Sequence, residues 1–342
     1  MKKRLLKNQM GNSLEASGLS PKVVLIAAVI LMAYPVIFSS PFQRNLGVLV
    51  LMWACLGCAW NIFGGYTGQV CLGTAMFFGM GAYGVVLPYY YLNITPWVGI
   101  IIGMVLATIL ALLVAIPIFK LSAQYFSIAT LALGETVRII AVNLPITKGM
   151  QGISFLNMKD SFWYTLQTAS KVPYYYMFAI LLVIVFCLML WINNSRIGYY
   201  FRTIKANPVS AESIGINVRK YKTYALVMCA CIASVCGSIY AVYQTYVDPA
   251  TVLHSSLSTK MIIMAVIGGI GTVHGPILGA LILVPLSEYV RAANSGALPG
   301  IDLVIYGILI ILVILYQPDG VVSIIRKGRA YLVKRFRKEV SK

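Results

Sequence analysis

The sequence predicts an all-α integral membrane protein with about eight to ten transmembrane helices, some of them short, broken or re-entrant and rich in glycine. Hydrophobic residues make up 60% of the 342-residue chain and charged residues only 11%, far from the composition of a soluble domain. The second observation is the apolar segment from Ile262 to Val284, which glycines, His274 and Pro276 interrupt. Non-helical backbone at membrane depth is tolerated only where protein buries it or a water-filled cavity hydrates it, so this segment points to transport.

The predicted spanning helices follow from the lengths of the apolar runs. Eight runs approach the roughly 20 residues that are needed to cross a bilayer core. Two further segments are shorter and meet at Gly275 and Pro276, so they form either two short crossings or one re-entrant hairpin. In chain order, the eight runs are residues 23–40, 45–63, 74–92, 97–119, 123–143, 173–193, 223–245 and 302–317, and the two shorter segments are about 258–273 and 276–292.

The orientation in the membrane follows from the basic residues. Either eight or ten crossings place both termini on the same side. If that side is the cytoplasm, the cytoplasmic segments contain 20 of the 27 Lys and Arg residues. This bias is strong, so we expect both termini in the cytoplasm. It also accounts for the net charge of +18, which in a soluble protein would suggest a nucleic-acid partner.

The domain organisation is simple. Apolar runs extend over nearly the whole chain without a long polar block, so we predict one polytopic domain over residues 23–325. Basic cytoplasmic tails flank it at residues 1–22 and 326–342. No small-residue cleavage site follows the first apolar run, which we expect to be a retained signal-anchor.

Motifs for catalysis are absent or misleading. The chain has no G-x-x-x-x-G-K-[ST] sequence, so another subunit would have to bind any ATP that drives it. Neither His254 nor His274 has a partner at catalytic or metal-ligand spacing. All seven cysteines lie in or beside apolar segments and are expected to be free. A G-x-G-x-x-G match from Gly79 to Gly84 lies inside an apolar helix rather than after a strand. We therefore predict that the chain is not an enzyme and holds no metal or cofactor.

The longest polar insert predicted on the cytoplasmic side is residues 194–222. Asn207 and Pro208 suit a helix start, and the following residues could form a short amphipathic helix that ends at Gly215. Basic residues flank this short helix on both sides. The insert is either a docking surface for a cytoplasmic partner or an ordinary positive-inside loop.

Intramembrane charge is the guide to a translocation pathway. Glu135 and Arg138 are three residues apart on one predicted helix, close enough to pair. The pair is either a self-neutralising structural feature or part of a polar route that it shapes or gates, with Thr67 and Gln69 of the nearby glycine-rich segment.

Glycines at helical spacing predict close contacts between helices. The predicted close-packing residues are Gly65, Gly68, Gly81, Gly268, Gly269, Gly271, Gly275 and Gly279.

Five ordered segments carry a family resemblance. The chain resembles permeases of the branched-chain amino acid ABC importers from about residue 45 to 325, and it is nearer to the LivM-type than to the LivH-type subunit. The segments are NIFGGYTGQVCLGTAMFFGMGAYG from Asn61, TLALGETVRII from Thr130, the loop at residues 194–222, IGGIGTVHGPILGA from Ile267 and YQPDGVVSI from Tyr316.

The resemblance implies a multi-pass protein of a bacterial-type inner membrane that works with other chains. These are a second homologous permease, two cytoplasmic ATPases that bind ATP and Mg²⁺, and an extracytoplasmic substrate-binding protein. It also implies that the loop at residues 194–222 couples the permease to the ATPases. The chain departs from the general importer motif in one respect. Gly215 comes three residues after Glu212, and the general motif has a longer spacing there. The implied coupling residues are Arg202, Asn207, Pro208, Ala211, Glu212, Gly215 and Asn217.

The substrate expected from the resemblance is a branched-chain, hydrophobic amino acid. Urea, amides and other small polar solutes stay open as alternatives, because relatives in the same superfamily carry them. A further alternative is an ion-coupled secondary transporter, which would show an inverted repeat; the sequence shows no convincing one. The broken glycine-rich helices argue against a structural or receptor subunit without transport.

Overall fold

In the residues that it describes, the computed structural model is mainly helical, with one short pair of strands. The predicted tails at residues 1–22 and 326–342, and most of the predicted spans 23–40 and 302–317, lie outside the described residues. The described residues are 31–35, 37–38, 40–154, 166–168, 170–293, 307–308 and 311.

Eight of the ten predicted apolar segments coincide with helices of the structure. The helix α11 begins five residues before the predicted start at 223, because the Asn217 side chain caps its first turn and accepts from the Lys220 N–H at 3.0 Å. In chain order the elements are α3 (Pro41–Trp60), the π-helical turn η1 (Asn61–Gly65), α4 (Ala75–Leu92), α5 (Pro96–Ile118), α6 (Ala123–Asn143), the 3₁₀ turns η2 (Pro145–Thr147) and η3 (Gly149–Gln151), β1 (Ile153–Ser154), α8 (Val172–Asn194), α9 (Arg196–Ala206), α10 (Pro208–Ser213), α11 (Val218–Gln244), β2 (Tyr246–Val247), α12 (Pro249–Val252), α13 (Ser255–Gly268) and α14 (Gly275–Ala293).

Seven helical segments among the described residues are long and apolar enough to cross a membrane. This confirms the predicted class of all-α, multi-pass membrane protein. The helix α4 is not among the seven, and three tyrosines, residues 89–91, occupy its last turn.

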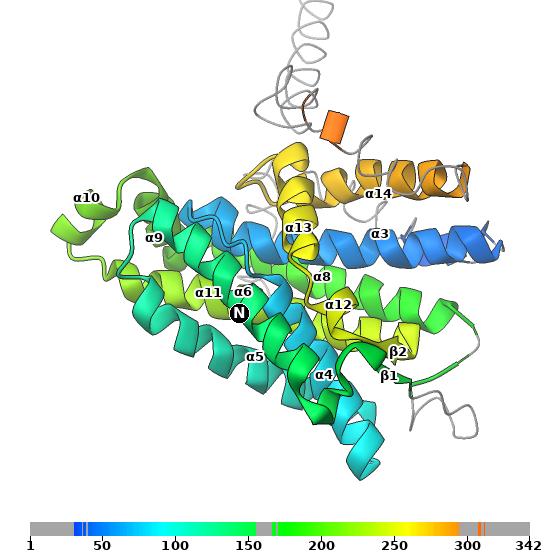
Figure 1. Cartoon of the computed structure of the whole chain (residues 1–342). Helices are drawn as coiled ribbons and strands as arrows, with labels where there is room; N and C mark the ends of the chain where they lie inside the picture. The colour runs from blue at the N-terminus through cyan, green and yellow to red at the C-terminus, as the bar shows by residue number, and fades with distance from the viewer. Residues whose placement is uncertain are drawn as a thin grey trace, which may run out of the picture.

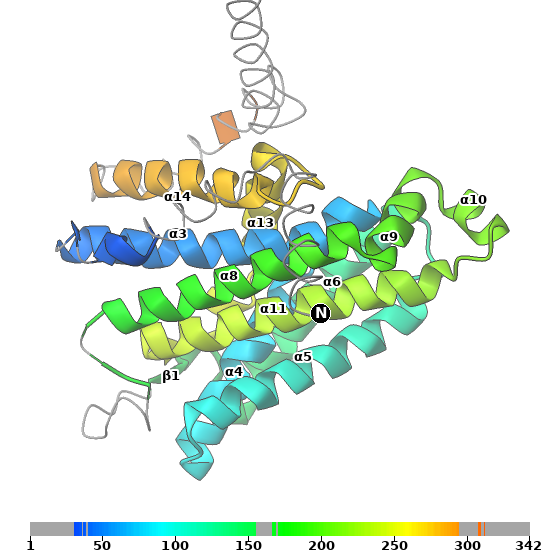
Figure 2. The same cartoon turned by 180° about the vertical axis from the view of Figure 1, so that it is seen from behind.

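The helix α13 differs in direction from its neighbours. It has 14 residues, or about 21 Å at 1.5 Å per residue, and is therefore too short to cross a hydrocarbon core of about 30 Å by itself. Figures 1 and 2 show it lying across α3 and α14 rather than along them. Together with α12 it makes a candidate span of 20 residues.

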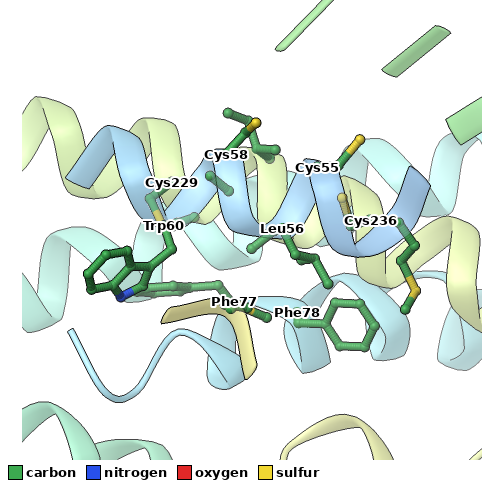
Figure 3. Close-up of a cluster of buried hydrophobic side chains, with 14 of the residues drawn as sticks. Cys55, Leu56, Cys58, Trp60, Phe77, Phe78, Cys229 and Cys236 are labelled. Carbon is green, nitrogen blue, oxygen red and sulfur yellow. The ribbon is translucent and has the colours of Figure 1, made fainter. Parts of the chain in front are cut away.

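Two helices form the centre of the helix pack. Within the apolar stretch of each span, 83% of the residues are buried in α3 with η1 and 72% in α11, against 22% in α6. Their side chains share one buried cluster with α4, part of which Figure 3 shows around Cys55, Phe78 and Cys236. The peripheral helices expose apolar side chains, as expected for a surface that faces lipid or another membrane protein.

Glycines bring α4 into backbone contact with α5 and α11. A Cβ on Gly99 of α5 would lie 2.8 Å from the Val85 Cα of α4. A Cβ on Gly81 of α4 would enter the backbone of α11 at Ser234, and the Ser238 hydroxyl donates to the Gly81 carbonyl at 2.9 Å. Small residues therefore fix the separation of these three helices.

The short elements that connect the spanning helices gather at two opposite ends of the helix pack. The helices α9 and α10 lie at one end, and the strands β1 and β2 lie at the other in both views (Figures 1 and 2). The strands are antiparallel, with Ile153 opposite Val247 and Ser154 opposite Tyr246. This arrangement agrees with a topology in which residues 194–222 are cytoplasmic and the strand pair is extracytoplasmic.

Candidate functional site: two helix breaks and a projecting loop

The membrane segment that begins with α3 does not continue regularly into α4. The helix passes into η1, and the chain is then irregular over residues 68–74, which we call the first break. Gly68 has a φ of +76°, in the left-handed region that favours glycine. Lipid offers no hydrogen-bond partners, so the polar groups of this backbone need partners from the protein or from water in a cavity.

The helix α6 supplies partners for the first break. The Ser127 hydroxyl donates to the Val70 carbonyl at 2.8 Å, and the Leu72 N–H donates to the Thr130 hydroxyl at 3.2 Å. The Thr130 side chain is completely buried. Two hydroxyls on one face of α6 thus replace hydrogen bonds that a regular helix would make within itself.

The second break, residues 269–274, separates α13 from α14. Gly269 and Gly271 have φ values of +130° and +78°. The Thr272 hydroxyl donates to the Gly269 carbonyl at 2.8 Å and accepts from the Gly275 N–H at 3.1 Å. Thr272 therefore stabilises the end of one helix and the beginning of the next.

The buried side chain of Asn61 joins η1, the turn that leads to the first break, to the second break. Its Oδ1 accepts from the Gly271 N–H at 2.8 Å, and its Nδ2 donates to the Thr272 carbonyl at 2.9 Å. A Cβ on Gly65 would lie 2.9 Å from the same Gly271 nitrogen. Segments 210 residues apart in the sequence consequently form one junction.

The predicted close-packing glycines divide into two groups. In the first group an added Cβ would enter a neighbouring backbone or the Asn61 side chain, and in the second the backbone has a positive φ. The first group is Gly65, Gly81, Gly268, Gly275 and Gly279, and the second is Gly68, Gly269 and Gly271.

Two of the predicted pathway residues lie at the first break. The Thr67 hydroxyl donates to the Phe63 carbonyl at 2.7 Å within its own turn. Gln69 is only 4% exposed, and its Oε1 has no hydrogen-bond partner among the described residues. Since a buried acceptor without a partner costs free energy, Gln69 is the more informative of the two.

The other two predicted pathway residues form an ion pair on α6. Arg138 Nε donates to Glu135 Oε1 at 2.7 Å, and the side chains are 24% and 38% exposed, respectively. The preceding residue, Gly134, packs against Gly73 at the end of the first break. A charged pair is costly against lipid, so this face of α6 requires protein or water next to it.

The loop at residues 194–222, called the projecting loop below, is ordered by local hydrogen bonds. Arg202 ties α9 to the end of α8: its Nη2 donates to the Asn193 carbonyl at 3.0 Å, and its Nε donates to the Gly198 carbonyl at 3.2 Å. Asn207 caps α10, because its Oδ1 accepts from the Val209 N–H at 2.9 Å.

The short helix α10 begins at Pro208 and is closed by a glycine turn. The Gly215 N–H donates to the Glu212 carbonyl at 2.9 Å, and the φ of Gly215 is +85°. Asn217 then caps α11. The sequence signals for a helix start at Asn207 and an end at Gly215 are both confirmed.

One face of α10 is buried and the other is free to contact a partner. Ala211 packs in a small cluster with Ile204, Ile216 and Val218. Val209 and Ile214 are 72% and 66% exposed, and Glu212 is exposed beside them. Figures 1 and 2 show α10 as the outermost element at its end of the described structure. Exposed apolar side chains on a projecting, well-capped helix are typical of a protein-binding surface.

Sequence reasoning missed several residues that hold this site together. Asn61, Ser127 and Thr130 bridge segments that are far apart, and Lys205 reaches from α9 to the Gly65 carbonyl at 2.8 Å. For Asn61, Ser127 and Thr130 the available signal was a polar residue inside an apolar run, whereas Lys205 lies in a polar insert and gave no such signal. Within the described part of the chain, no three His, Cys, Asp or Glu side chains gather as a metal site would require.

The chain is similar to transport permeases over most of its length. The sequence profile of a family described as the permease component of branched-chain amino acid transport systems matches residues 44–314. The high-affinity branched-chain amino acid transport system permease protein LivM of Escherichia coli K12 is 26% identical over 340 residues, covering 92% of this chain and 78% of that protein. The probable LivM permease of Methanocaldococcus jannaschii is 26% identical over 66% of this chain and 70% of that protein. The nucleoside ABC transporter permease protein NupC of Lactococcus lactis is 25% identical over 44% of this chain and 49% of that protein.

Proposed function

Because the chain belongs to the family of permease components of branched-chain amino acid transport systems, we propose that it carries branched-chain amino acids through the membrane with the help of separate chains. It is a multi-pass membrane protein and the permease subunit of an ABC importer. The proposal adds the substrate and the identity of the partners.

The observation that supports this proposal best is the projecting loop. Its outermost helix, α10, is capped at both ends and presents Val209, Glu212 and Ile214 to its surroundings. The chain itself has no phosphate-binding G-x-x-x-x-G-K-[ST] sequence. We assign α10 to the contact with one of two cytoplasmic ATPases, which bind the ATP and Mg²⁺ and supply the energy.

The polar face of α6 supports a second permease subunit. The ion pair of Glu135 and Arg138 is partly exposed, on a helix in whose apolar stretch only 22% of the residues are buried. Contact with a homologous permease, or with water enclosed between the two, would remove that pair from lipid. The extracytoplasmic substrate-binding protein would deliver its ligand at the opposite end, where β1 and β2 lie.

Affinity purification from membranes in mild detergent tests the partners. We expect the tagged chain to purify with a second permease and with one or two ATPases that contain a phosphate-binding loop, as identified by mass spectrometry. Purification of the chain alone, at full yield and in two different mild detergents, would contradict the proposed assembly.

Competition for uptake tests the substrate. In cells that express the complete importer, we expect unlabelled leucine, isoleucine and valine to block uptake of labelled leucine, while urea and a nucleoside do not. Uptake of urea or a nucleoside without leucine uptake would replace the proposed substrate with that of another branch of the superfamily.

A further inference from the structure

We infer that Lys205, at the end of α9, is the residue that transmits movement of the projecting loop to the two helix breaks. Lys205 Nζ donates to the Gly65 carbonyl at 2.8 Å, a contact between residues 140 positions apart in the sequence. Gly65 is the last residue of η1, where the chain enters the first break. The inference rests on the proposed function, because it concerns how work done on α10 reaches the membrane.

The Gly65 carbonyl is a favourable acceptor for an ammonium group. Carbonyls in the last turn of a helix lack the partners that the helix interior provides, and the helix dipole places negative partial charge there. Lys205 lies in the last turn of α9 and is exposed as a residue, and its ammonium group nevertheless bonds to this carbonyl. A lysine in an exposed loop ordinarily keeps its ammonium group in water.

Glycines of both breaks make room for this side chain. A Cβ on Gly68 would lie 3.0 Å from Lys205 Cγ, and a Cβ on Gly271 would lie 3.2 Å from Lys205 Nζ. Gly68 belongs to the first break and Gly271 to the second. The lysine side chain therefore lies against both breaks, at the point where the Asn61 side chain joins η1 to the second break.

On the other side, Lys205 is connected directly to α10. Only Ala206 separates it from Asn207, whose side chain caps α10. Arg202, three residues before Lys205 in α9, ties this helix to the end of α8. A displacement of α10 therefore acts directly on the last turn of α9. This turn does not move freely, because Arg202 holds α9 to the end of α8.

These contacts form a continuous path of hydrogen bonds and short chain segments. It runs from α10 through Lys205 to Gly65, then through Asn61 to Gly271 and Thr272. When the ATPases move α10, the Lys205 ammonium group pulls on the end of η1 and shifts both breaks together. Both breaks have glycines with positive φ, so they are the segments whose backbone can change conformation with the least steric resistance.

The test measures ATP hydrolysis and substrate uptake separately, in vesicles that contain the complete purified complex. We compare the wild type with K205M, which keeps the aliphatic length but removes the ammonium group, and with K205R, which keeps a charged donor. K220M is the matched control, because Lys220 lies in the same loop and loses the same charge without contacting either break.

We expect K205M to assemble and hydrolyse ATP at a rate close to that of the wild type, but to transport about tenfold less substrate per ATP, as expected for the loss of one charge-assisted hydrogen bond. K205R should recover most of this ratio and K220M should leave it unchanged. If K205M does not assemble, K205Q, which keeps an N–H donor without the charge, should show the same reduced ratio.

An unchanged ratio of transport to hydrolysis in K205M, or an equal decrease in K220M, would overturn the assignment of Lys205 alone. Wild-type uptake that does not depend on ATP would instead overturn the proposed function, and the Lys205 assignment with it. The two failures are therefore distinguishable in one experiment.

Discussion

Gly81, inside the helix pack, and Gly215, in the projecting loop, are glycines for different physical reasons. A Cβ on Gly81 would enter the backbone of α11, whereas a Cβ on Gly215 would have nothing within 4 Å. Gly215 is needed instead for its φ of +85°, which closes the turn after α10. The first glycine sets how closely helices approach, and the second sets the course of an exposed chain.

This difference predicts different effects of substitution in the two regions. A substitution in the helix pack changes the fold, because tightly packed backbones have no space to yield. A substitution at the exposed turn after α10 changes mainly a surface that a partner contacts. The two breaks lie between these extremes: each is buried only in part, with Val70 and Ile270 exposed, and three of their glycines have positive φ like the turn after α10.

The largest effect is expected for Gly81→Val, which tests the packed side of the comparison. The added side chain would force α4 away from α11 and cost at least about 3 kcal/mol of stability. We expect little protein in the membrane fraction and a lower melting temperature in detergent. Gly215→Ala is the control, and near-normal yield of Gly81→Val would show that the helices are not held at the observed separation.

Gly215→Pro tests the projecting loop. Proline fixes φ near −65° and removes the N–H that donates to the Glu212 carbonyl, so the turn after α10 cannot form. We expect normal membrane insertion and complete loss of uptake. Gly215→Ala, with about 1 kcal/mol of backbone strain, should retain partial uptake. Uptake by Gly215→Pro at the wild-type rate would remove α10 from the coupling surface.

Glu135→Gln tests the role of the ion pair on α6, at the periphery of the helix pack. It leaves Arg138 without its anionic partner, and we expect uptake to fall about tenfold because charge-assisted hydrogen bonds are lost. If the pair lines a polar route, the double variant Glu135→Gln/Arg138→Gln should stay defective in transport while assembling normally. Recovery of uptake in the double variant would make the pair purely structural.

The smallest effect is expected for Ser127→Ala, which removes one hydrogen bond to the first break. The loss of its bond to the Val70 carbonyl should cost about 1 kcal/mol of stability. We expect a slightly lower melting temperature and largely retained uptake. Ser213→Ala, on the exposed side of α10, is the control and should not change the melting temperature. Equal melting temperatures for both variants would show that α6 does not support the break.

Local patterns in the sequence predicted the projecting loop well. Asn207, Pro208 and Gly215 act on their immediate neighbours, so their roles as helix start and stop can be read without knowing the fold. The spanning helices were predictable for the same reason, since length and hydropathy are local properties.

Contacts between distant segments could not be predicted in this way. Lys205 and Asn61 bond to residues 140 and 210 positions away, respectively, and nothing in their own surroundings indicates those partners. The direction of α13 is a similar case. The sequence left open whether its segment crosses or re-enters, because that depends on how α13 packs against α3 and α14.

The most direct test of the account is uptake of labelled leucine into vesicles that contain either the co-purified complex or this chain alone. The account predicts uptake by the complex only, with ATP and the substrate-binding protein present, and none with a non-hydrolysable ATP analogue. Uptake by the chain alone, driven by an ion gradient without ATP, would contradict the account and identify a secondary transporter.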